Sequence, residues 1–77
     1  MIFRWNPSKA KINLEKHGID FREGASVLDD PLATTFPDPD HSREEQRFIT
    51  IGVSKQGRLL VVAHVEVGDT VRIISAR

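Results

Sequence analysis

The chain has 77 residues, no cysteine, and eleven lysines and arginines balanced by eleven aspartates and glutamates. We expect one domain, residues 1–77, with a small core, and the absence of cysteine excludes disulfides and thiolate zinc sites. The formal net charge of +0 excludes a basic field over the whole surface, so phosphate binding requires a local cluster of cations. Neither a signal peptide nor an apolar run of the ~20 residues that cross a membrane is found, so we expect a cytoplasmic protein that does not contact a membrane.

Residues 2–18 predict a strand followed by a helix, with residues 2–5 forming the strand. Asn6 and Pro7 predict the start of the helix, because Asn caps free backbone N–H groups and Pro fits the first helical position. Gly18 predicts its end, since glycine readily adopts the left-handed conformation that closes a helix. One face of this helix would present Ala10, Leu14 and His17.

The next segment predicts a second helix and a short strand. Asp20 and Glu23 form a capping box with Asp in place of Ser or Thr, and residues 29–31 end the helix. Its apolar stripe comprises Phe21, Ala25 and Leu28. Residues 32–36 predict a strand, and residues 37–42 a polar loop whose two prolines restrict the backbone.

The remainder of the chain predicts strands joined by tight turns. The strands span residues 47–53, 59–65 and 70–75, with turns at residues 55–57 and 68–69. Consecutive strands with such turns form an antiparallel meander. The order β-α-α-β-β-β-β therefore predicts an α+β fold in which two N-terminal helices pack on one face of an antiparallel meander sheet.

This arrangement leaves one face of the sheet without a cover. The strand at residues 59–65 is apolar on both faces, with Leu59, Val61, Ala63 and Val65 on one of them. Two helices cover only one face, and an exposed apolar sheet usually marks a partner surface. We therefore expect a homo-oligomer or a complex with a partner protein.

His64 and Glu66 are candidates for acid–base chemistry. They lie two positions apart on one strand, so they share a face, and the carboxylate would raise the pKa of the imidazole. The alternative interpretation is the end of the sheet, where apolar residues give way to solvated ones.

Arg72 and Arg77 are candidate ligands of an anion, because the guanidinium group matches the oxygens of a phosphate. On a straight strand their spacing places them on opposite faces, so they would act together only if the chain bends after Ser75. The alternative is that one arginine extends along the surface, that the other is a frayed terminal residue, or that both pair with the chain's own carboxylates.

Asp38, Asp40 and His41 resemble ligands of a hard metal or zinc. Asp-Pro repeats also build turns, and no second cluster completes a coordination shell, so we expect neither a metal nor a cofactor. Lys9 lies on a lysine-rich helix face, which is either solvated or contacts a phosphate backbone or an acidic partner.

Several segments, taken in their order and spacing over nearly the whole chain, match one known family. They are Phe3-Arg4-Trp5-Asn6, Lys9-Ala10, Asn13, Lys16-His17-Gly18-Ile19, Phe21, Asp38 to Ser42, Glu45, Arg47, Gly57 to Val62, His64, Glu66, and Arg72 to Arg77. In these segments the chain resembles the BrnT toxins of bacterial and archaeal type II toxin–antitoxin systems.

The resemblance implies a RelE-like fold and a ribonuclease that inhibits translation by cutting RNA without a metal, through attack of the 2′-hydroxyl on the adjacent phosphate. It also implies a BrnA-type antitoxin that neutralises the toxin, and binding of operator DNA only through that antitoxin. The alternative is a truncated, catalytically inactive protein-interaction module of the same fold.

The resemblance also implies roles for individual residues. The catalytic set comprises His64 and Glu66 as the acid–base pair and Arg72 and Arg77 as phosphate ligands. The set that binds RNA phosphates comprises Arg47, His41 and Lys9. Two departures stand out: Val67 occupies a position where the family usually has a basic residue, and the family continues beyond Arg77 into a basic helix that would cover the open sheet face.

Overall fold

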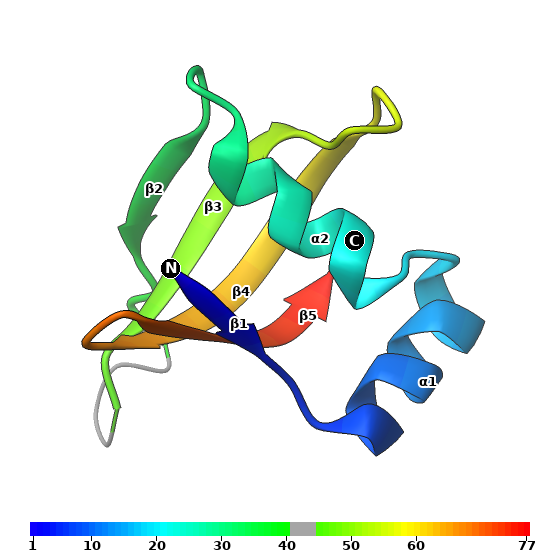
Figure 1. Cartoon of the computed structure of the whole chain (residues 1–77), viewed down its shortest axis with the longest axis horizontal. Coiled ribbons are helices and arrows are strands. Elements are labelled where there is room, and N and C mark those ends of the chain that lie inside the picture. Colours follow the sequence, from blue (N-terminus) through cyan, green and yellow to red (C-terminus); the bar gives the residue numbers. More distant parts are fainter. Residues whose placement is uncertain (41–44) are drawn as a thin grey trace.

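The computed structural model describes residues 1–40 and 45–77 and has the predicted order of helices and strands (Figure 1). The elements are β1 (Ile2–Arg4), α1 (Pro7–His17), α2 (Phe21–Ser26), the 3-10 turn η1 (Val27–Asp29), β2 (Thr34–Pro37), β3 (Arg47–Val53), β4 (Leu59–Val67) and β5 (Thr70–Ala76). The prediction of an α+β fold with two N-terminal helices is therefore confirmed. No helix in the described part of the chain is long and apolar enough to cross a membrane.

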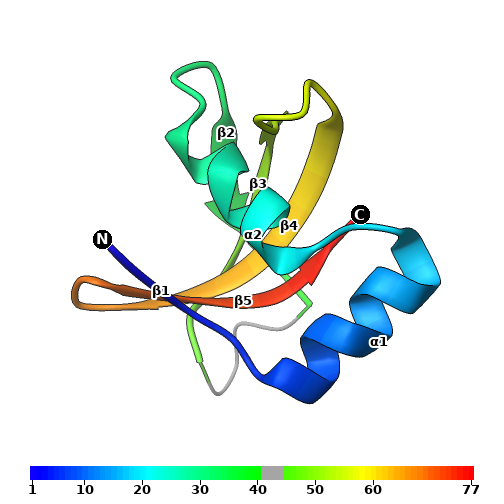
Figure 2. The ribbon, with the colours of Figure 1, turned by 45° about the vertical axis from the view of Figure 1, so that its right-hand side comes forward.

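The strands form one five-stranded sheet in the order β1-β5-β4-β3-β2 (Figure 2). Strands β2 to β5 are antiparallel neighbours. The tight turns predicted the pairing of β3 with β4 and of β4 with β5, whereas β2 pairs with β3 across the polar loop. β1, however, pairs in parallel with β5, with Arg4 opposite Arg72, so the sheet is mixed rather than wholly antiparallel. The rule for tight turns does not apply to β1, because its partner lies at the far end of the chain.

Local caps fix both ends of α1 and the start of α2. The Oδ1 atom of Asn6 accepts hydrogen bonds from the backbone N–H groups of Ser8 and Lys9 at 2.9 and 3.2 Å. Gly18 ends α1 with a φ of 70°, in the left-handed region. Asp20 caps α2 by accepting from the N–H of Arg22 at 2.6 Å. The caps at Asn6, Gly18 and Asp20 were predicted from the sequence. The other half of the predicted capping box is wrong, because the carboxylate of Glu23 accepts hydrogen bonds from Ser54 and Arg58 and not from the N–H of Asp20.

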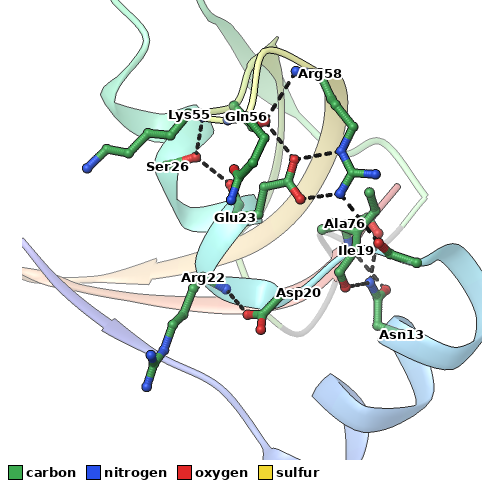
Figure 3. A network of polar contacts seen from close by, with 12 residues as sticks. Asn13, Ile19, Asp20, Arg22, Glu23, Ser26, Lys55, Gln56, Arg58 and Ala76 are labelled. Carbon is green, nitrogen blue, oxygen red and sulfur yellow. Dashed lines mark hydrogen bonds and ion pairs between the residues drawn. The ribbon is translucent and has the colours of Figure 1, made fainter.

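Asn13, rather than the predicted stripe, is the buried residue of α1. Leu14 remains 48% exposed, whereas Asn13 is 6% exposed. Its Nδ2 donates to the carbonyl oxygens of Ile19 and Ala76 at 3.1 and 2.8 Å, and its Oδ1 accepts from the N–H of Ala76 at 3.2 Å (Figure 3). The amide therefore pairs with the edge of β5 beyond the end of β1, as a neighbouring strand would.

The core lies between α2 and one face of the sheet, which we term the covered face. Its buried residues are Ile19, Phe21, Ala25, Val27, Leu60, Val62, Val71, Ile73 and Ala76. α2 ends at Ser26, earlier than predicted, and Val27 in η1 is fully buried while Leu28 only packs at the margin. At Gly24 an added Cβ would lie 2.9 Å from the Cβ of Ala76, so glycine permits the close approach of α2 to β5.

The opposite side of the sheet, which we term the open face, has apolar residues that the described chain does not cover. Leu59 is 71% exposed, Val53 46% and Ile51 37%. The register places these residues on the same face as Val61 and Ala63, which are half-buried. The expectation of an uncovered apolar sheet face therefore agrees with the structure.

Candidate functional site

A β-bulge in β5 places Arg72 and Arg77 on the same face of the sheet. Arg72 lies opposite Val65, but the register shifts between Ala63 and His64 because Ile74 has no partner on β4. After the bulge, Arg77 exchanges two backbone hydrogen bonds with Val61, at 2.6 and 3.0 Å. Since Val61 and Val65 share the open face, both arginines lie on that face. The bend that would bring them together therefore comes before Ser75 rather than after it.

Arginines also form a row across the strands at one end of the open face. The register places Arg4 on β1 beside Arg72 on β5, then Val65 on β4, then Arg47 on β3. Neighbouring strands lie ~4.8 Å apart, so the row spans three strand spacings. We call these three arginines the arginine row. The locally concentrated cations that a neutral chain needs for phosphate binding are therefore present on this face.

Arg72 is held by a carboxylate from the segment just before β3. Its Nη2 lies 2.8 Å from both Oε1 and Oε2 of Glu45. The two side chains remain 43% and 46% exposed, so solvent screens the pair. Val65 lies between Arg72 and Arg47 in the register and is only 3% exposed. The salt bridge to the chain's own carboxylates, one of the alternatives for Arg72, is therefore present.

Lys9 lies beside a shallow groove between α1 and the bulge of β5. The groove has a volume of about 210 Å³, and its lining includes Lys9, Lys16 and His17 from α1 and Ile74 and Ser75 from β5. Because the side chain of Ser75 belongs to the open face, the groove meets that face at the part of β5 between Arg72 and Arg77. His41, predicted as an RNA-binding residue, lies outside the described residues.

His64 lies on the covered face and is completely buried. Its Nε2 is 2.7 Å from the Oγ1 of Thr50, which lies 2.7 Å from the Oγ1 of Thr35. Its Nδ1 has no hydrogen-bond partner in the described chain and is 3.7 Å from Oε1 of Glu66. Phe48 stacks on the ring, with centroids 6.0 Å apart. Burial lowers the pKa of the imidazole below its ordinary value of 6.5, and the Glu66 carboxylate offsets only part of this effect.

The sheet therefore divides the predicted catalytic set into two groups. His64 and Glu66 lie close together on the covered face, as their spacing predicted, although the pKa of His64 is lowered rather than raised. Arg72 and Arg77 lie on the open face, together with Arg47. An anion bound by the arginines is separated from the imidazole by the backbone of the sheet.

The acidic loop before β3 does not form a metal site within the described residues. Asp38 is buried, and its Oδ1 accepts a hydrogen bond from the N–H of Asp40 at 3.0 Å, which is the geometry of a turn. No group of three or more metal-ligating side chains is found in residues 1–40 and 45–77. His41, the remaining candidate ligand, lies outside these residues.

Arg58 belongs to a structural network and not to the open face (Figure 3). Its Nε donates to Oε2 of the buried Glu23 at 2.8 Å, and its Nη2 pairs with Oε1. The hydroxyl of Ser54 donates to the same carboxylate at 2.7 Å. The bond from Arg58 is the main reason that the pKa of Glu23 is lowered from 4.5, against the opposing effect of burial. The network fastens α2 to the turn between β3 and β4.

Sequence reasoning did not identify Arg4 and Glu45 as site residues. Arg4 belongs to the arginine row only because β1 pairs with β5, a contact between the two ends of the chain. Glu45 precedes β3, and its contact with Arg72 crosses β4. Alternation within single strands predicts neither contact, because both depend on which strands are neighbours.

Comparison with known proteins identifies the family. Residues 5–77 match the family model described as the ribonuclease toxin BrnT of type II toxin–antitoxin systems. The fold is similar to the crystal structure of the Brucella abortus ribonuclease toxin BrnT, with 26% sequence identity, a TM-score of 0.76, and coverage of 100% of this chain and 95% of that chain. No curated protein sequence matches the chain. As the resemblance predicted, the chain belongs to the BrnT family of type II toxin–antitoxin ribonuclease toxins.

Proposed function

We propose that this chain is the toxin of a type II toxin–antitoxin pair and that it inhibits translation in the cytoplasm by cutting RNA. Membership of the family supports this activity. The structural observation that supports it best is the gathering of Arg4, Arg47, Arg72 and Arg77 on one face of a protein whose net charge is +0. Such a local cluster gives a neutral protein the means to bind a phosphate backbone.

In the proposed mechanism the RNA backbone lies across the open face. Arg72 and Arg77 stabilise the charge that develops on the phosphate as the 2′-hydroxyl attacks it, and Arg47 assists them. Lys9 and His41 contact neighbouring phosphates. This route uses only groups of the protein and the RNA, so we propose that cleavage needs no metal.

His64 and Glu66 remain the predicted acid–base pair. Because the imidazole is buried on the covered face, direct catalysis would require the end of β4 to open and expose it. The variant His64→Gln separates this role from a structural one. If His64 is catalytic, cleavage is lost while the unfolding free energy measured at pH 8 changes little. If His64 is structural, cleavage and stability fall together.

Cleavage of a purified transcript by the purified chain, in the presence of a metal chelator, tests the proposed function. Arg72→Gln is expected to slow cleavage by about 10²-fold, the typical effect of removing one group that stabilises transition-state charge. Arg22→Gln is the matched control, because it removes the same charge from an exposed position on α2, away from the open face. Equal rates for the two variants would contradict the site, and no cleavage by the wild type would contradict the function.

We also propose that a BrnA-type antitoxin neutralises the toxin by binding the open face, and that the pair contacts operator DNA only through the antitoxin. The exposed apolar residues of β3 and β4 offer a hydrophobic seat beside the arginine row, which suits a partner segment with apolar and acidic side chains. An antitoxin bound there would exclude RNA. The same surface would also mediate the predicted self-association, which light scattering of the isolated chain tests.

Expression in bacteria with and without the neighbouring gene tests the antitoxin and the alternative of an inactive interaction module. Growth arrest that the neighbour relieves supports the toxin, whereas normal growth together with a stable complex supports the inactive module. Leu59→Lys on the open face is expected to weaken the complex. Leu32→Lys is the control, because Leu32 is 88% exposed but lies in the turn before β2.

A further inference from the structure

Arg4 and Arg72 are directly adjacent cations on neighbouring strands. The parallel register of β1 and β5 makes them partners, and both side chains lie on the open face because Phe3 and Val71, the preceding pair, pack in the core. Like charges at directly opposed positions of neighbouring strands destabilise a sheet. The fold therefore has a small local cost at this point, which a bound anion would remove.

The two arginines differ in what neutralises them. Arg72 contacts both carboxylate oxygens of Glu45 at 2.8 Å. Arg4 is exposed and makes no side-chain hydrogen bond or ion pair within residues 1–40 and 45–77. The carboxylate of Glu45 therefore contacts one of two neighbouring arginines, and an anion with more oxygens could contact both.

The carboxylate of Glu45 contacts Arg72 where an oxygen of such an anion would bind. Its two oxygens approach a single Nη2 atom of Arg72 on an exposed surface, as two oxygens of a phosphate diester can. Because both side chains are more than two-fifths exposed, the contact is screened by solvent and weak enough to exchange. Glu45 also lies at the end of a segment that enters β3 and is not itself part of a strand, so its side chain can move away without breaking the sheet.

From these contacts we propose that Arg4 and Arg72 form one binding site for a phosphate of RNA, and that Glu45 occupies the Arg72 half of this site until RNA displaces it. The proposal rests on the proposed function and adds a second phosphate ligand and an internal competitor. Arg4 binds and positions the RNA backbone beside Arg72. Glu45 lowers the affinity of the free protein for RNA.

Binding of a single-stranded 2′-O-methyl RNA, which lacks the attacking hydroxyl, tests the site without cleavage. Arg4→Gln is expected to weaken binding about fivefold at about 0.1 M salt and to reduce the slope of log affinity against log salt by about 0.7, the contribution of one phosphate contact. Arg22→Gln, the control with the same charge change on α2, is expected to leave the slope unchanged. Arg4→Gln also removes a like-charge neighbour, so its Tm should equal or exceed that of the wild type, and the weaker binding does not reflect unfolding.

The second half of the proposal concerns Glu45. Glu45→Gln is expected to strengthen RNA binding by a similar factor, whereas Glu15→Gln, an exposed change on α1, is expected to have little effect. A slope for Arg4→Gln equal to that of Arg22→Gln would overturn the two-arginine site, and unchanged or weaker binding by Glu45→Gln would overturn the internal competitor. If either result is found while the wild type cleaves RNA normally, the proposed function still stands. A wild-type chain that neither binds nor cleaves RNA would overturn both.

Discussion

Replacing Asn13 by Ala should destabilise the protein far more than its helical position suggests. The change removes the bonds from Nδ2 to Ile19 and Ala76 and the bond from Ala76 to Oδ1. Each such bond contributes about 1 kcal/mol net, and the abandoned backbone groups lie in a buried site, so we expect a loss of about 3 kcal/mol. A domain of this length is stable by only about 4–12 kcal/mol, which makes that loss a large fraction.

Urea unfolding followed by the fluorescence of Trp5 measures this loss. Trp5 is the only tryptophan, and its ring packs edge-on against the buried Phe21 with centroids 6.2 Å apart, so its emission reports the core. Asn6→Ala is the control, because it removes an amide from the same helix at an exposed cap, where the cost is about 1 kcal/mol. If Asn13→Ala costs no more than Asn6→Ala, the amide does not satisfy the edge of β5 in solution.

The substitution Asn13→Asp gives a second test of the same contact. The carboxyl group keeps an acceptor for the N–H of Ala76 but, once ionised, has no proton to donate to the carbonyl oxygens of Ile19 and Ala76. Folding should therefore raise the pKa of this carboxyl. Stability relative to the wild type should fall as pH rises through that pKa, and a difference that does not depend on pH would contradict the assigned direction of these bonds.

Further predictions concern the covered face and its network. Gly52→Ala should cost about 1–3 kcal/mol in urea unfolding, because the new Cβ would lie 2.8 Å from the Cβ of Ala33. A neutral result would mean that the segment around Ala33, just before β2, can move away from β3 at little cost. Folding lowers the pKa of the Glu23 carboxyl group from its ordinary value of 4.5. The ionised carboxylate therefore stabilises the fold at pH values above 4.5, and this contribution is lost as the pH falls through the lowered pKa. Glu23→Gln should reduce the dependence of stability on pH in this acidic range. An unchanged dependence would show that Glu23 is not paired with Arg58 in solution. Burial lowers the pKa of His64, so as the pH falls the unfolded chain takes up a proton before the folded chain does. Stability should therefore decrease as the pH drops below 6.5. This decrease should be absent in His64→Gln, and its persistence would mean that another group causes it.

Sequence reasoning succeeded where neighbouring residues determine the structure. Asn6, Gly18 and Asp20 mark helix ends through bonds that span no more than four residues, and the turns of the meander are similarly local. The fold class follows from these elements. The uncovered sheet face follows as well, because two short helices cannot cover both sides of a sheet.

The remaining features depend on contacts between distant parts of the chain. Asn13 was not predicted as the buried residue of α1, because only the edge of β5, 63 positions away, gives a polar side chain a reason to be buried there. The partner of β1 was not predicted, and Arg4 was missed with it. The burial of His64 beneath Phe48 and Thr50 likewise depends on the register of β3 and β4. The two-residue spacing along β4 predicted that His64 and Glu66 lie together, but it did not predict that the arginines lie on the opposite face of the sheet.

The unpaired Ile74 shows that strand length can set charge placement as effectively as residue identity. Side chains alternate along a strand, so odd and even positions belong to opposite sides until one residue is skipped. Here the skipped residue reverses this parity for everything after it and puts Arg77 on the side of Arg72. A relative that lacked one residue at this point would turn the same arginine toward α2, although its charged residues would be the same. In alignments of such chains, a gap at this position would therefore signify a change of surface chemistry.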